Sequence, residues 1–460
     1  MSKLFLIFFS ATISMMKKYN ITCPSGFPEF SPAEERVRQN WLAVIRGVFE
    51  KNGFLPVETP LVEREENLLA KGGNPKEMYV LKRVQDDDDT SHSGNALRFD
   101  HTVPLALYVA RHLNELAFPF RRYSIGPVLR GERAQKGRFR QFDQCDIDMI
   151  GSGELSLLND ALVAVVIVQL FEQLNIGEFF VRINNRKILT GFFENLNIKS
   201  KDISAVMMIV DDLEKIGATK VLENLVKLGV KKDLAQEILN FTEISGTNEE
   251  IFKRLEQIKG GELFTEGVQD LKEVFSALSA MNVPENRVKL DLSIARGLDY
   301  YTGTVYETIL TGYEGLGSIC SGGRYDDLAE VFTGKKLPGV GISIGLTRLL
   351  SQLFDAKIIE PERSSPTEVL IITTSPDFMS NALEIGAKIR GMGFCTENYV
   401  EDKKLGKQFD YANKLGIPVC VVMGESEVEK GTVQIKNMTS GEQTEVTLEQ
   451  LEKGLKNILK

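Results

Sequence analysis

The segment between Phe120 and Ile150 constrains the fold of this 460-residue chain more than any other. Its last part, from Phe139 onward, alternates like a β-strand, and short polar turns favour antiparallel pairing with the strand before it. Between Phe120 and Arg140 the chain has seven cations but a single acid, Glu132, and the glycines Gly131 and Gly137 lie among them; the cations are Arg121, Arg122, Arg130, Arg133, Lys136, Arg138 and Arg140. Because seven like charges repel one another, we favour an anion-binding hairpin over a solvated basic face, and guanidinium groups suit phosphate oxygens.

The composition predicts a folded, water-soluble protein of two or three domains, since 43% of the residues are hydrophobic and 26% are charged. The 64 acidic residues outnumber the 55 basic ones and give a net charge of −9. A nucleic acid would therefore have to meet a local basic patch, because the field of the whole molecule is mildly repulsive. This balance argues against a histone-like coat protein and leaves enzymes open.

Cysteine and histidine usage argues against structural metal and disulfides. The five cysteines lie far apart without a C-x-x-C pair, which excludes a zinc ribbon or a disulfide framework and fits a reducing cytoplasm. There are only three histidines and no H-E-x-x-H motif, so a zinc hydrolase is not expected. No metal site built from protein side chains is predicted, although carboxylates could hold magnesium around a nucleotide.

The N-terminus carries an apolar stretch, Leu4 to Met16, between lysines. It is too short to span a bilayer but has the length of a signal-peptide core. Three interpretations are open: an upstream start codon before a natural start at Met15 or Met16, a targeting peptide, or an apolar strand or helix. The first is preferred because the rest of the chain has cytoplasmic character, so residues 1–23 are treated as an extension. No later stretch approaches 18 uninterrupted apolar residues.

Two local patterns define the start of the folded part. Apolar residues recur at helical spacing from Ser31 to Asn52, with Ser31 as N-cap, Pro32 at the first helical position and Glu34 completing a capping box. The stretch Phe54 to Pro60 follows as a strand, and its prolines restrict it to an edge or an end of a sheet.

Blocks of helical and strand character follow. A helix is expected over Thr102 to Asn114, and residues 186–286 carry helical periodicity among many lysines and glutamates, which predicts an inserted helical subdomain. Strand and glycine signals resume from Val288 to Arg324, and a glycine turn leads from strand to helix between Pro338 and Leu353. The acidic run Asp86 to Asp89 is interpreted as a solvated loop.

A polar, proline-flanked linker, Pro361 to Pro366, predicts a domain boundary between 24–360 and 367–460. Buried strands and helices alternate beyond it, at Val369–Ile372, Asn381–Met392, Cys395–Tyr399, Lys407–Leu415 and Val419–Met423. The β-α-β-α-β order predicts a separate α/β domain with a mixed or parallel sheet covered by helices.

Three further motifs combine glycine with reactive side chains. Arg296 to Glu307 places an arginine, an acid and three tyrosines on a glycine-interrupted strand, whose alternate residues face opposite ways unless a bulge intervenes. Ser321 to Asp326 sets adjacent glycines before an arginine and a tyrosine, either as a hairpin turn or to let the backbone approach a ligand. Gly339 to Leu350 is a glycine turn from strand to helix, a weak signal alone. The absence of G-x-x-x-x-G-K-[ST] excludes a P-loop NTPase.

Taken in this order, the segments resemble class II aminoacyl-tRNA synthetases and, within that class, the histidyl-tRNA synthetase family. The first helix with its proline-ended strand is similar to the first class motif, a dimer-interface element; Arg130–Phe142 is similar to the second motif and Gly345–Arg348 to the third. Arg296–Tyr301 and Ser321–Tyr325 match the two histidine-specific signatures. The resemblance implies an α+β fold: a class II catalytic domain built on an antiparallel sheet with a helical insertion, plus a C-terminal α/β anticodon-binding domain.

The resemblance implies an ATP site. Arg130 would grip the α-phosphate, Phe142 would stack on the adenine, and Glu132 would contact the adenine side. Arg138 and Arg348 would hold the distal phosphates, and the charges suit each role.

The resemblance makes Arg296, with Arg130, the implied catalytic residue. Arg296 would sit between the substrate carboxylate and the α-phosphate and neutralise charge during in-line attack, a role that a metal plays in related enzymes. Carboxylates would attract the ammonium and imidazole of histidine, and tyrosine or amide groups would complete its hydrogen bonds. The implied histidine-binding residues are Asp100, His101, Thr102, Arg130, Gln144, Asp148, Arg296, Tyr300, Tyr301 and Tyr325.

The implied reaction has two steps. The carboxylate of L-histidine attacks the α-phosphate of ATP, which comes with Mg²⁺, and the terminal ribose hydroxyl of tRNA(His) then takes the acyl group from histidyl-adenylate. Arg133 and Gln135 would meet the acceptor end, while the tail domain would bind the anticodon. The resemblance also implies a cytoplasmic homodimer without membrane association.

Three positions depart from the commoner family pattern. His101 stands where leucine or glycine is usual, and Thr347 replaces a frequent glutamate. Asp148 is one methylene shorter than the glutamate of many members, which would weaken or reposition the imidazole contact. None of these changes removes a required charge.

Other functions fit parts of the pattern. Catalytically inactive paralogues that regulate ATP phosphoribosyltransferase share the fold, but they usually lack the tail domain and erode arginines that this chain keeps, namely Arg130, Arg296 and Arg348. A synthetase for glycine, proline or threonine would share the class motifs without the two histidine-specific signatures. A non-enzymatic tRNA-sensing module is opposed by the same arginines.

Overall fold

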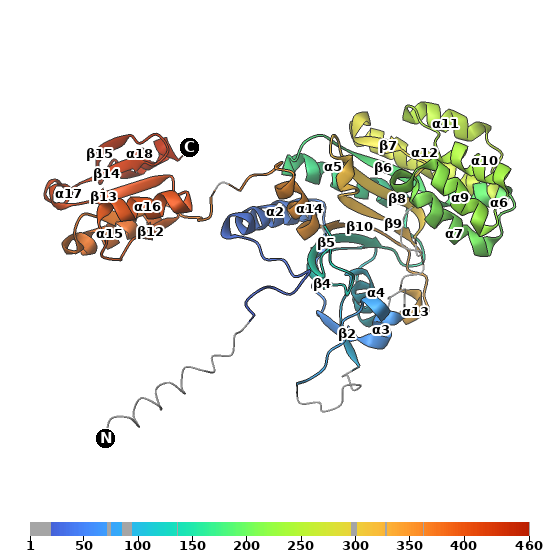
Figure 1. Ribbon diagram of the computed structural model, residues 1–460, viewed down its shortest axis with the longest axis horizontal. Coiled ribbons are helices and arrows are strands. Elements are labelled where there is room, and N and C mark those ends of the chain that lie inside the picture. The colour runs from blue at the N-terminus through green and yellow to red at the C-terminus, as the bar shows by residue number, and fades with distance from the viewer. Residues whose placement is uncertain are drawn as a thin grey trace, which may run out of the picture.

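The computed structural model describes residues 20–70, 75–84, 94–135, 137–295, 301–326, 329–361 and 363–459. The apolar segment Leu4 to Met16 and the acidic run Asp86 to Asp89 lie outside these residues. Figure 1 shows a larger body that ends with α14 (Leu346–Asp355) and a smaller one that begins with β11 (Val369–Thr373). Among the described residues, no helix is long and apolar enough to cross a membrane.

An eight-stranded sheet forms the centre of the larger body, in the order β1-β4-β5-β10-β9-β8-β6-β7. The strands are β1 (Leu55–Pro56), β4 (Phe120–Leu129), β5 (Gln141–Ile150), β6 (Phe179–Asn185), β7 (Val288–Leu290), β8 (Tyr301–Leu310), β9 (Cys320–Tyr325) and β10 (Gly339–Gly345). Every pairing from β4 to β6 is antiparallel, and only the edge strands β1 and β7 pair in parallel. The predicted antiparallel sheet and the hairpin of β4 and β5 are confirmed.

The first helix, α2 (Pro32–Lys51), begins as the sequence predicts. The Ser31 side chain accepts from the backbone N–H of Glu34, and the Glu34 carboxylate closes the capping box on the Ser31 N–H. The predicted strand over Phe54 to Pro60 is wrong in extent, since only the two residues of β1 pair with β4. Its position at the sheet edge agrees with its prolines.

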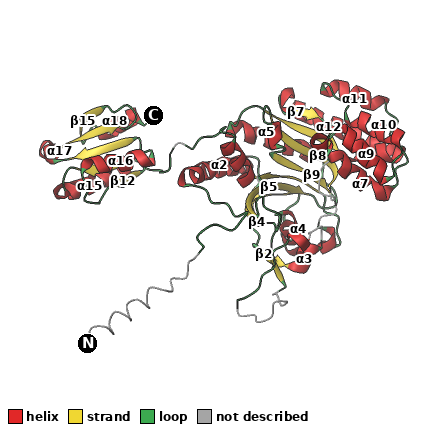
Figure 2. Cartoon of the chain, viewed as in Figure 1, coloured by secondary structure: helices red, strands yellow, loops and turns green. Residues whose placement is uncertain are grey.

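Helices fill the block predicted as a helical insertion and gather at the β6–β7 end of the sheet (Figure 2). They are α6 (Arg186–Asn195), α7 (Ser200–Asp211), α8 (Leu213–Ile216), α9 (Ala218–Leu228), α10 (Lys232–Thr242), α11 (Asn248–Gln257) and α12 (Gly261–Ala280). The limits of an inserted subdomain at 186–286, and of domains at 24–360 and 367–460, stay predictions.

Further helices and strands complete the larger body. They are β2 (Val62–Arg64) paired with β3 (Asn95–Leu97), α3 (Glu65–Leu69), α4 (Thr102–Arg111), α5 (Leu158–Leu174), α13 (Glu330–Thr333) and the 3₁₀ helices η1 (Pro75–Glu77), η2 (Glu285–Arg287) and η3 (Glu314–Leu316). The helix α4 ends three residues before the predicted Asn114.

The two faces of the large sheet differ in chemistry because side chains alternate along each strand. The core face packs against α2 and α5 and carries Tyr123, Cys145, Ile147, Met149, Tyr306 and Ile342, all in one buried apolar cluster. The opposite face, called the polar face below, carries Arg122, Ser124, Gln144, Asp146, Asp148, Tyr325 and Ser343. Residues paired across neighbouring strands share a face, so the register alone assembles this set.

The smaller body holds a five-stranded sheet in the order β12-β11-β13-β14-β15. Its further elements are η4 (Pro376–Phe378), α15 (Met379–Gly391), β12 (Thr396–Asn398), α16 (Leu405–Leu415), β13 (Val419–Met423), α17 (Glu425–Lys430), β14 (Thr432–Asn437), β15 (Gln443–Thr447) and α18 (Leu451–Ile458). Strands β11, β12 and β13 are parallel, whereas β14 and β15 are antiparallel. The predicted β-α-β-α-β order is confirmed, and the final hairpin and α18 extend it.

Candidate active site

The loop between β4 and β5 ends in a tight turn. Gln135 and Arg138 exchange two backbone hydrogen bonds, of 3.3 and 2.8 Å, and Gly137 adopts a φ of 72° that suits glycine. The side chains of Arg133, Gln135 and Arg138 are exposed there. The two residues predicted to contact the acceptor end of tRNA therefore lie on an open, basic loop.

Arg130 and Phe142 face each other where the hairpin opens. The Arg130 guanidinium lies 5.2 Å from the centre of the Phe142 ring, a cation–π contact. Its Nε donates to the backbone oxygen of Phe99 at 3.0 Å, which fixes its direction. Glu132 lies 3.6 Å from Arg138 on the same loop. The structure thus brings together four of the five predicted ATP-binding side chains.

The fifth, Arg348, projects from α14. It is exposed, and its Nη2 donates to the backbone oxygen of Leu316 at 3.3 Å. Gln352, one turn further along α14, donates to the same oxygen and also lies beneath Gly137 of the hairpin loop. The helix of the third class motif therefore lies next to the tip of the β4–β5 hairpin.

Asp148 is buried between two partners on the polar face. Arg122 Nη2 lies 2.7 Å from its Oδ2, and the Tyr325 hydroxyl donates to its Oδ1 at 2.8 Å. Burial raises the pKa of the Asp148 carboxyl, and the Arg122 charge opposes that rise. The sequence analysis counted Arg122 among the seven cations of an anion-binding hairpin, and for Arg122 this is wrong, because its side chain is 1% exposed and paired with Asp148 inside the sheet.

Glycines of β9 and β10 make room for these side chains. A Cβ on Gly341 would overlap the Asp148 carboxylate, and one on Gly339 would overlap the Tyr325 ring. A Cβ on Gly323 would lie 2.9 Å from the Tyr301 ring. The motif Ser321 to Asp326 is therefore strand, not a hairpin turn, and its glycines permit close side-chain packing rather than a reversal of the chain.

Tyr301 lies opposite Tyr325 on the neighbouring strand, and the pairing of β8 with β9 is irregular between Tyr301 and Val305. This irregularity is the bulge that a glycine-interrupted strand allows. Arg296 and Tyr300 lie outside the described residues, so the role implied for each stays a prediction.

The start of α4 contributes Asp100, His101 and Thr102. Asp100 Oδ1 accepts from the backbone N–H of Val103 at 3.1 Å, and burial raises the pKa of its carboxyl. The His101 ring is buried, with Nε2 3.1 Å from the oxygen of Gly126 and Nδ1 3.3 Å from a serine hydroxyl on β4. Burial lowers the pKa of His101 to about 3, so the ring is neutral, with Nε2 donating to the carbonyl oxygen.

A network that the sequence reasoning missed joins the three class motifs. Arg38 of α2 donates from Nε and Nη2 to Asp143 Oδ2, at 3.0 and 2.7 Å. The backbone N–H of Asp143 on β5 donates in turn to Thr347 Oγ1 of α14, at 2.9 Å. Asp143 stands between Phe142 and Gln144, so the network fixes two predicted substrate-binding residues from behind. The only sign of this network in the sequence was Thr347, which stands where glutamate is frequent in the family.

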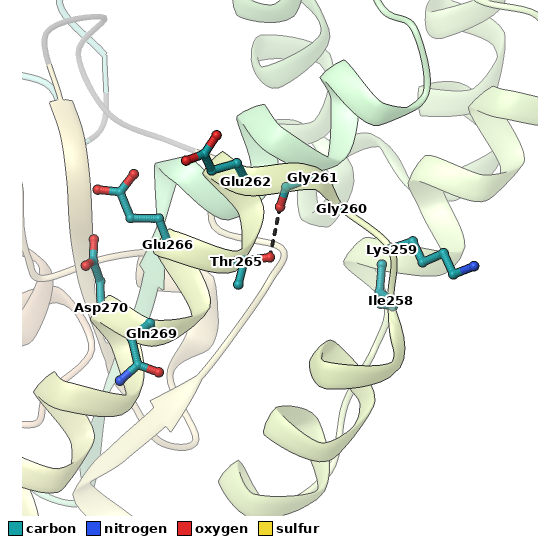
Figure 3. Close-up of a pocket in the computed structure, with 9 residues that line it drawn as sticks. All are labelled: Ile258, Lys259, Gly260, Gly261, Glu262, Thr265, Glu266, Gln269 and Asp270. Atoms are coloured by element: carbon teal, nitrogen blue, oxygen red, sulfur yellow. Dashed lines mark hydrogen bonds between the residues drawn. The ribbon is translucent and has the colours of Figure 1, made fainter.

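Nothing in the described part of the chain groups three or more His, Cys, Asp or Glu residues in a metal-binding arrangement. A surface cavity lies where α12 begins, lined by residues between Ile258 and Asp270 (Figure 3). It contains none of the predicted site residues, and Lys187 already pairs with two of its acids, Glu266 and Asp270.

An antiparallel sheet whose polar face meets an arginine hairpin, backed by a strand-to-helix glycine turn, defines a class II aminoacyl-tRNA synthetase. A family model described as histidyl-tRNA synthetase matches residues 26–349, and one described as anticodon binding domain matches residues 368–458. The chain belongs to the histidyl-tRNA synthetase family.

Individual relatives agree with this assignment. A histidine–tRNA ligase of Clostridium tetani (strain Massachusetts / E88) is 47% identical over 446 residues, which cover 96% of this chain and 100% of the relative. The crystal structure of histidyl-tRNA synthetase from Nostoc sp. PCC 7120 is 45% identical with a TM-score of 0.88, covering 96% of this chain and all of that one. An ATP phosphoribosyltransferase regulatory subunit/histidyl-tRNA synthetase from Bacillus halodurans C shares the fold, with 19% identity, a TM-score of 0.72 and coverage of 89% and 100%.

Proposed function

We propose that the chain activates L-histidine with ATP and transfers the histidyl group to tRNA(His). The observation that carries the proposal is that Phe142, Gln144 and Asp148 share one face of β5, with Arg130 over Phe142 and Tyr325 on Asp148. Asp148 lies six positions after Phe142, roughly 20 Å along the strand at about 3.3 Å per residue. That length accommodates a nucleotide and an amino acid laid end to end.

In the proposed first step, adenine stacks on Phe142 beside Glu132, and Arg130 binds the α-phosphate. Arg138 and Arg348 hold the distal phosphates from the loop and from α14. Arg296 neutralises the charge that builds as the histidine carboxylate attacks phosphorus and pyrophosphate leaves. No protein nucleophile takes part, so positioning and electrostatics supply the catalysis.

The histidine site is proposed to lie on the polar face, next to the start of α4. Tyrosine, amide and carboxylate groups meet the substrate side chain and ammonium, while His101 holds the α4 start against β4 through its two ring nitrogens. The proposed members are Asp100, His101, Thr102, Arg130, Gln144, Asp148, Arg296, Tyr300, Tyr301 and Tyr325.

The tRNA is proposed to contact Arg133 and Gln135 with its acceptor end and the C-terminal body with its anticodon. Mg²⁺ is proposed to arrive with ATP on its phosphate oxygens, because the described residues offer no metal cluster of their own. A cytoplasmic homodimer is proposed, with the capped, amphipathic α2 as part of its interface.

The test is exchange of labelled pyrophosphate into ATP by the purified chain, with histidine and with a panel of other amino acids. Exchange with histidine alone, lost in Arg296→Ala and kept in the exposed α11 control Arg254→Ala, is the expected result. Exchange with a different amino acid would contradict the histidine assignment. A folded chain without exchange for any amino acid would favour a regulatory paralogue, whose fold is the same.

A further inference from the structure

The polar face keeps buried polar atoms that the fold does not satisfy. Nine buried side-chain atoms of the described residues have no hydrogen-bond partner, and four of them lie on this part of the sheet: Arg122 Nε and Nη1, Gln144 Oε1 and Asp146 Oδ1. Each such atom costs about 1–3 kcal/mol when buried alone. These four atoms belong to Arg122, which pairs with the buried Asp148, and to Gln144 and Asp146, which share its face of β5. Their grouping points to a ligand that completes them.

Asp146 is the residue in this group with the clearest unused capacity. It is 3% exposed and stands between Gln144 and Asp148 on the same face of β5. The Ser343 hydroxyl on the paired strand β10 hydrogen-bonds to its carboxylate and accepts from Gln144 Nε2 at 2.8 Å, which holds Asp146 in place.

Asp148, by contrast, has both oxygens engaged. Its Oδ2 pairs with Arg122 and its Oδ1 accepts from Tyr325. The family resemblance assigns the imidazole contact to Asp148, whose side chain is also short for that task. An imidazole has an N–H that must find an acceptor once it is buried.

We propose that Asp146 is a specificity-determining residue, whose unpartnered Oδ1 accepts the hydrogen bond from the ring N–H of the substrate histidine. This inference rests on the proposed function and adds a residue to its site. A site that hydrogen-bonds a substrate N–H rejects an isostere without it, because the buried acceptor then stays unpaired. Burial raises the pKa of the Asp146 carboxyl to about 7, so an N–H donor can shift it to the ionised form at little cost near neutral pH.

The experiment compares the full-length parent with Asp146→Asn in pyrophosphate exchange, using histidine and β-thiazolylalanine, an isostere that keeps a ring nitrogen and lacks the N–H. The variant is expected to raise the KM for histidine at least 10-fold and to leave the KM for ATP within twofold. It is also expected to lower the preference for histidine over the isostere at least 10-fold. A purely structural role would not move that preference.

Two further variants keep the test decisive. Ser343→Ala frees the Asp146 side chain without removing its charge, so we expect a smaller rise in the KM for histidine, about threefold, even if Asp146→Asn folds poorly. Glu307→Gln is the matched control, because Glu307 is a buried carboxylate of the same sheet that pairs with Arg182 at 2.6 Å. It is expected to leave the KM for histidine within twofold.

An unchanged KM for histidine and an unchanged preference in folded Asp146→Asn would overturn the inference and leave the proposed function intact. Equal rises in the KM of histidine and ATP would also overturn it, as a general disturbance of the site. A parent chain without histidine-dependent exchange would overturn the proposed function and this inference with it.

Discussion

Two buried arginines sit on opposite faces of the same sheet and are treated differently by the fold. Arg324, on the core face, is 9% exposed, and every guanidinium nitrogen has a partner. Its Nε and Nη2 donate to Asp160, the shorter bond being 2.5 Å, while Nη1 and Nη2 donate to the backbone oxygens of Leu155 and Ser156 at 3.1 Å.

Arg122, on the polar face, is more deeply buried and less well paired. Its Nη2 reaches Asp148 and, at 3.3 Å, the backbone oxygen of His101, whereas Nε and Nη1 have no partner. The contrast shows that a buried charged side chain does not by itself identify a binding site, because the fold supplies every partner that Arg324 needs. What distinguishes the polar face is charge left incompletely satisfied, as a face that must receive a polar substrate requires.

The substitution Arg324→Met is expected to have the largest effect, and it tests whether Arg324 serves stability alone. The change leaves Asp160 buried and unpaired, so we expect a loss of about 3–5 kcal/mol in the free energy of unfolding. Protein folded at low temperature is expected to keep the parent KM for histidine and ATP. Urea unfolding and exchange kinetics check both, and the double variant Arg324→Met with Asp160→Leu should recover most of the stability. A shift in either KM without destabilisation would show that the core-face arginine serves the site.

The polar face should instead cost stability. The pKa of Asp146 is raised from 3.8 to about 7 in the folded chain, so the unfolded chain loses this proton at lower pH. Folded-state stability from this group therefore falls as the pH rises from about 4 to about 7 and is level above that range. Asp146→Asn does not titrate, and we expect it to gain about 4 kcal/mol over the parent by pH 8, at about 1.4 kcal/mol per pH unit.

Urea midpoints of the parent and Asp146→Asn between pH 4 and pH 8 measure this gain. Asp100 and Asp148 also have pKa values raised by burial, so the difference between the two chains isolates Asp146 better than either curve alone. A gain that does not grow with pH would mean that Asp146 is ionised and well compensated in the folded chain. If Asp146→Asn is more stable than the parent but binds histidine less tightly, it shows the trade-off between stability and function that is expected of a ligand-binding face.

Arg122→Met sharpens the contrast between the two arginines. Without this cation the pKa values of Asp146 and Asp148 rise further, and both carboxyls can take up protons instead of staying charged and unpaired. We expect histidine-dependent exchange to fall about 100-fold, which is about 2.7 kcal/mol, with a smaller loss of stability than in Arg324→Met. Exchange and urea unfolding of both variants, measured side by side, test the order, and a reversed order would remove the distinction.

The sequence predicted those parts of the fold that depend on local chemistry. The capping box at Ser31 uses neighbouring residues only, and the strands of the C-terminal body are short apolar runs bounded by turns. The sequence analysis missed the helix α5 because buried residues lie on most sides of it. Ten of its residues are buried, most of them apolar, so no amphipathic period marks the helix. The strand predicted over Phe54 to Pro60 was too long, because its prolines limit how many residues can pair in the sheet.

The sequence predicted only those site residues that occupy positions of the family motifs. Arg130, Gln144 and Asp148 follow from the resemblance, and the structure places them on the hairpin as that implies. Asp146 was missed although it alternates with Gln144 and Asp148, because a charge count along the chain does not separate the faces of a strand. Arg122 pairs with Asp148 on the neighbouring hairpin strand, but the pair is completed and covered by Tyr325 and strand β10, more than 100 residues further along the chain, which no local pattern encodes.

The smallest expected effect comes from the network behind the polar face. Asp143 faces away from Gln144 and is held by Arg38 and by the hydroxyl of Thr347, so this support orients Phe142 and Gln144 without touching substrate. Thr347→Val keeps the shape and removes the acceptor of the Asp143 N–H, at a cost of about 1 kcal/mol. We expect a three- to fivefold higher KM for ATP in pyrophosphate exchange with kcat nearly unchanged, and Thr347→Ser, which keeps the hydroxyl, should restore the parent value. If serine and valine behaved alike, the methyl packing of Thr347 rather than its hydrogen bond would position β5, and the chain's departure from glutamate would have no role in orienting the adenine.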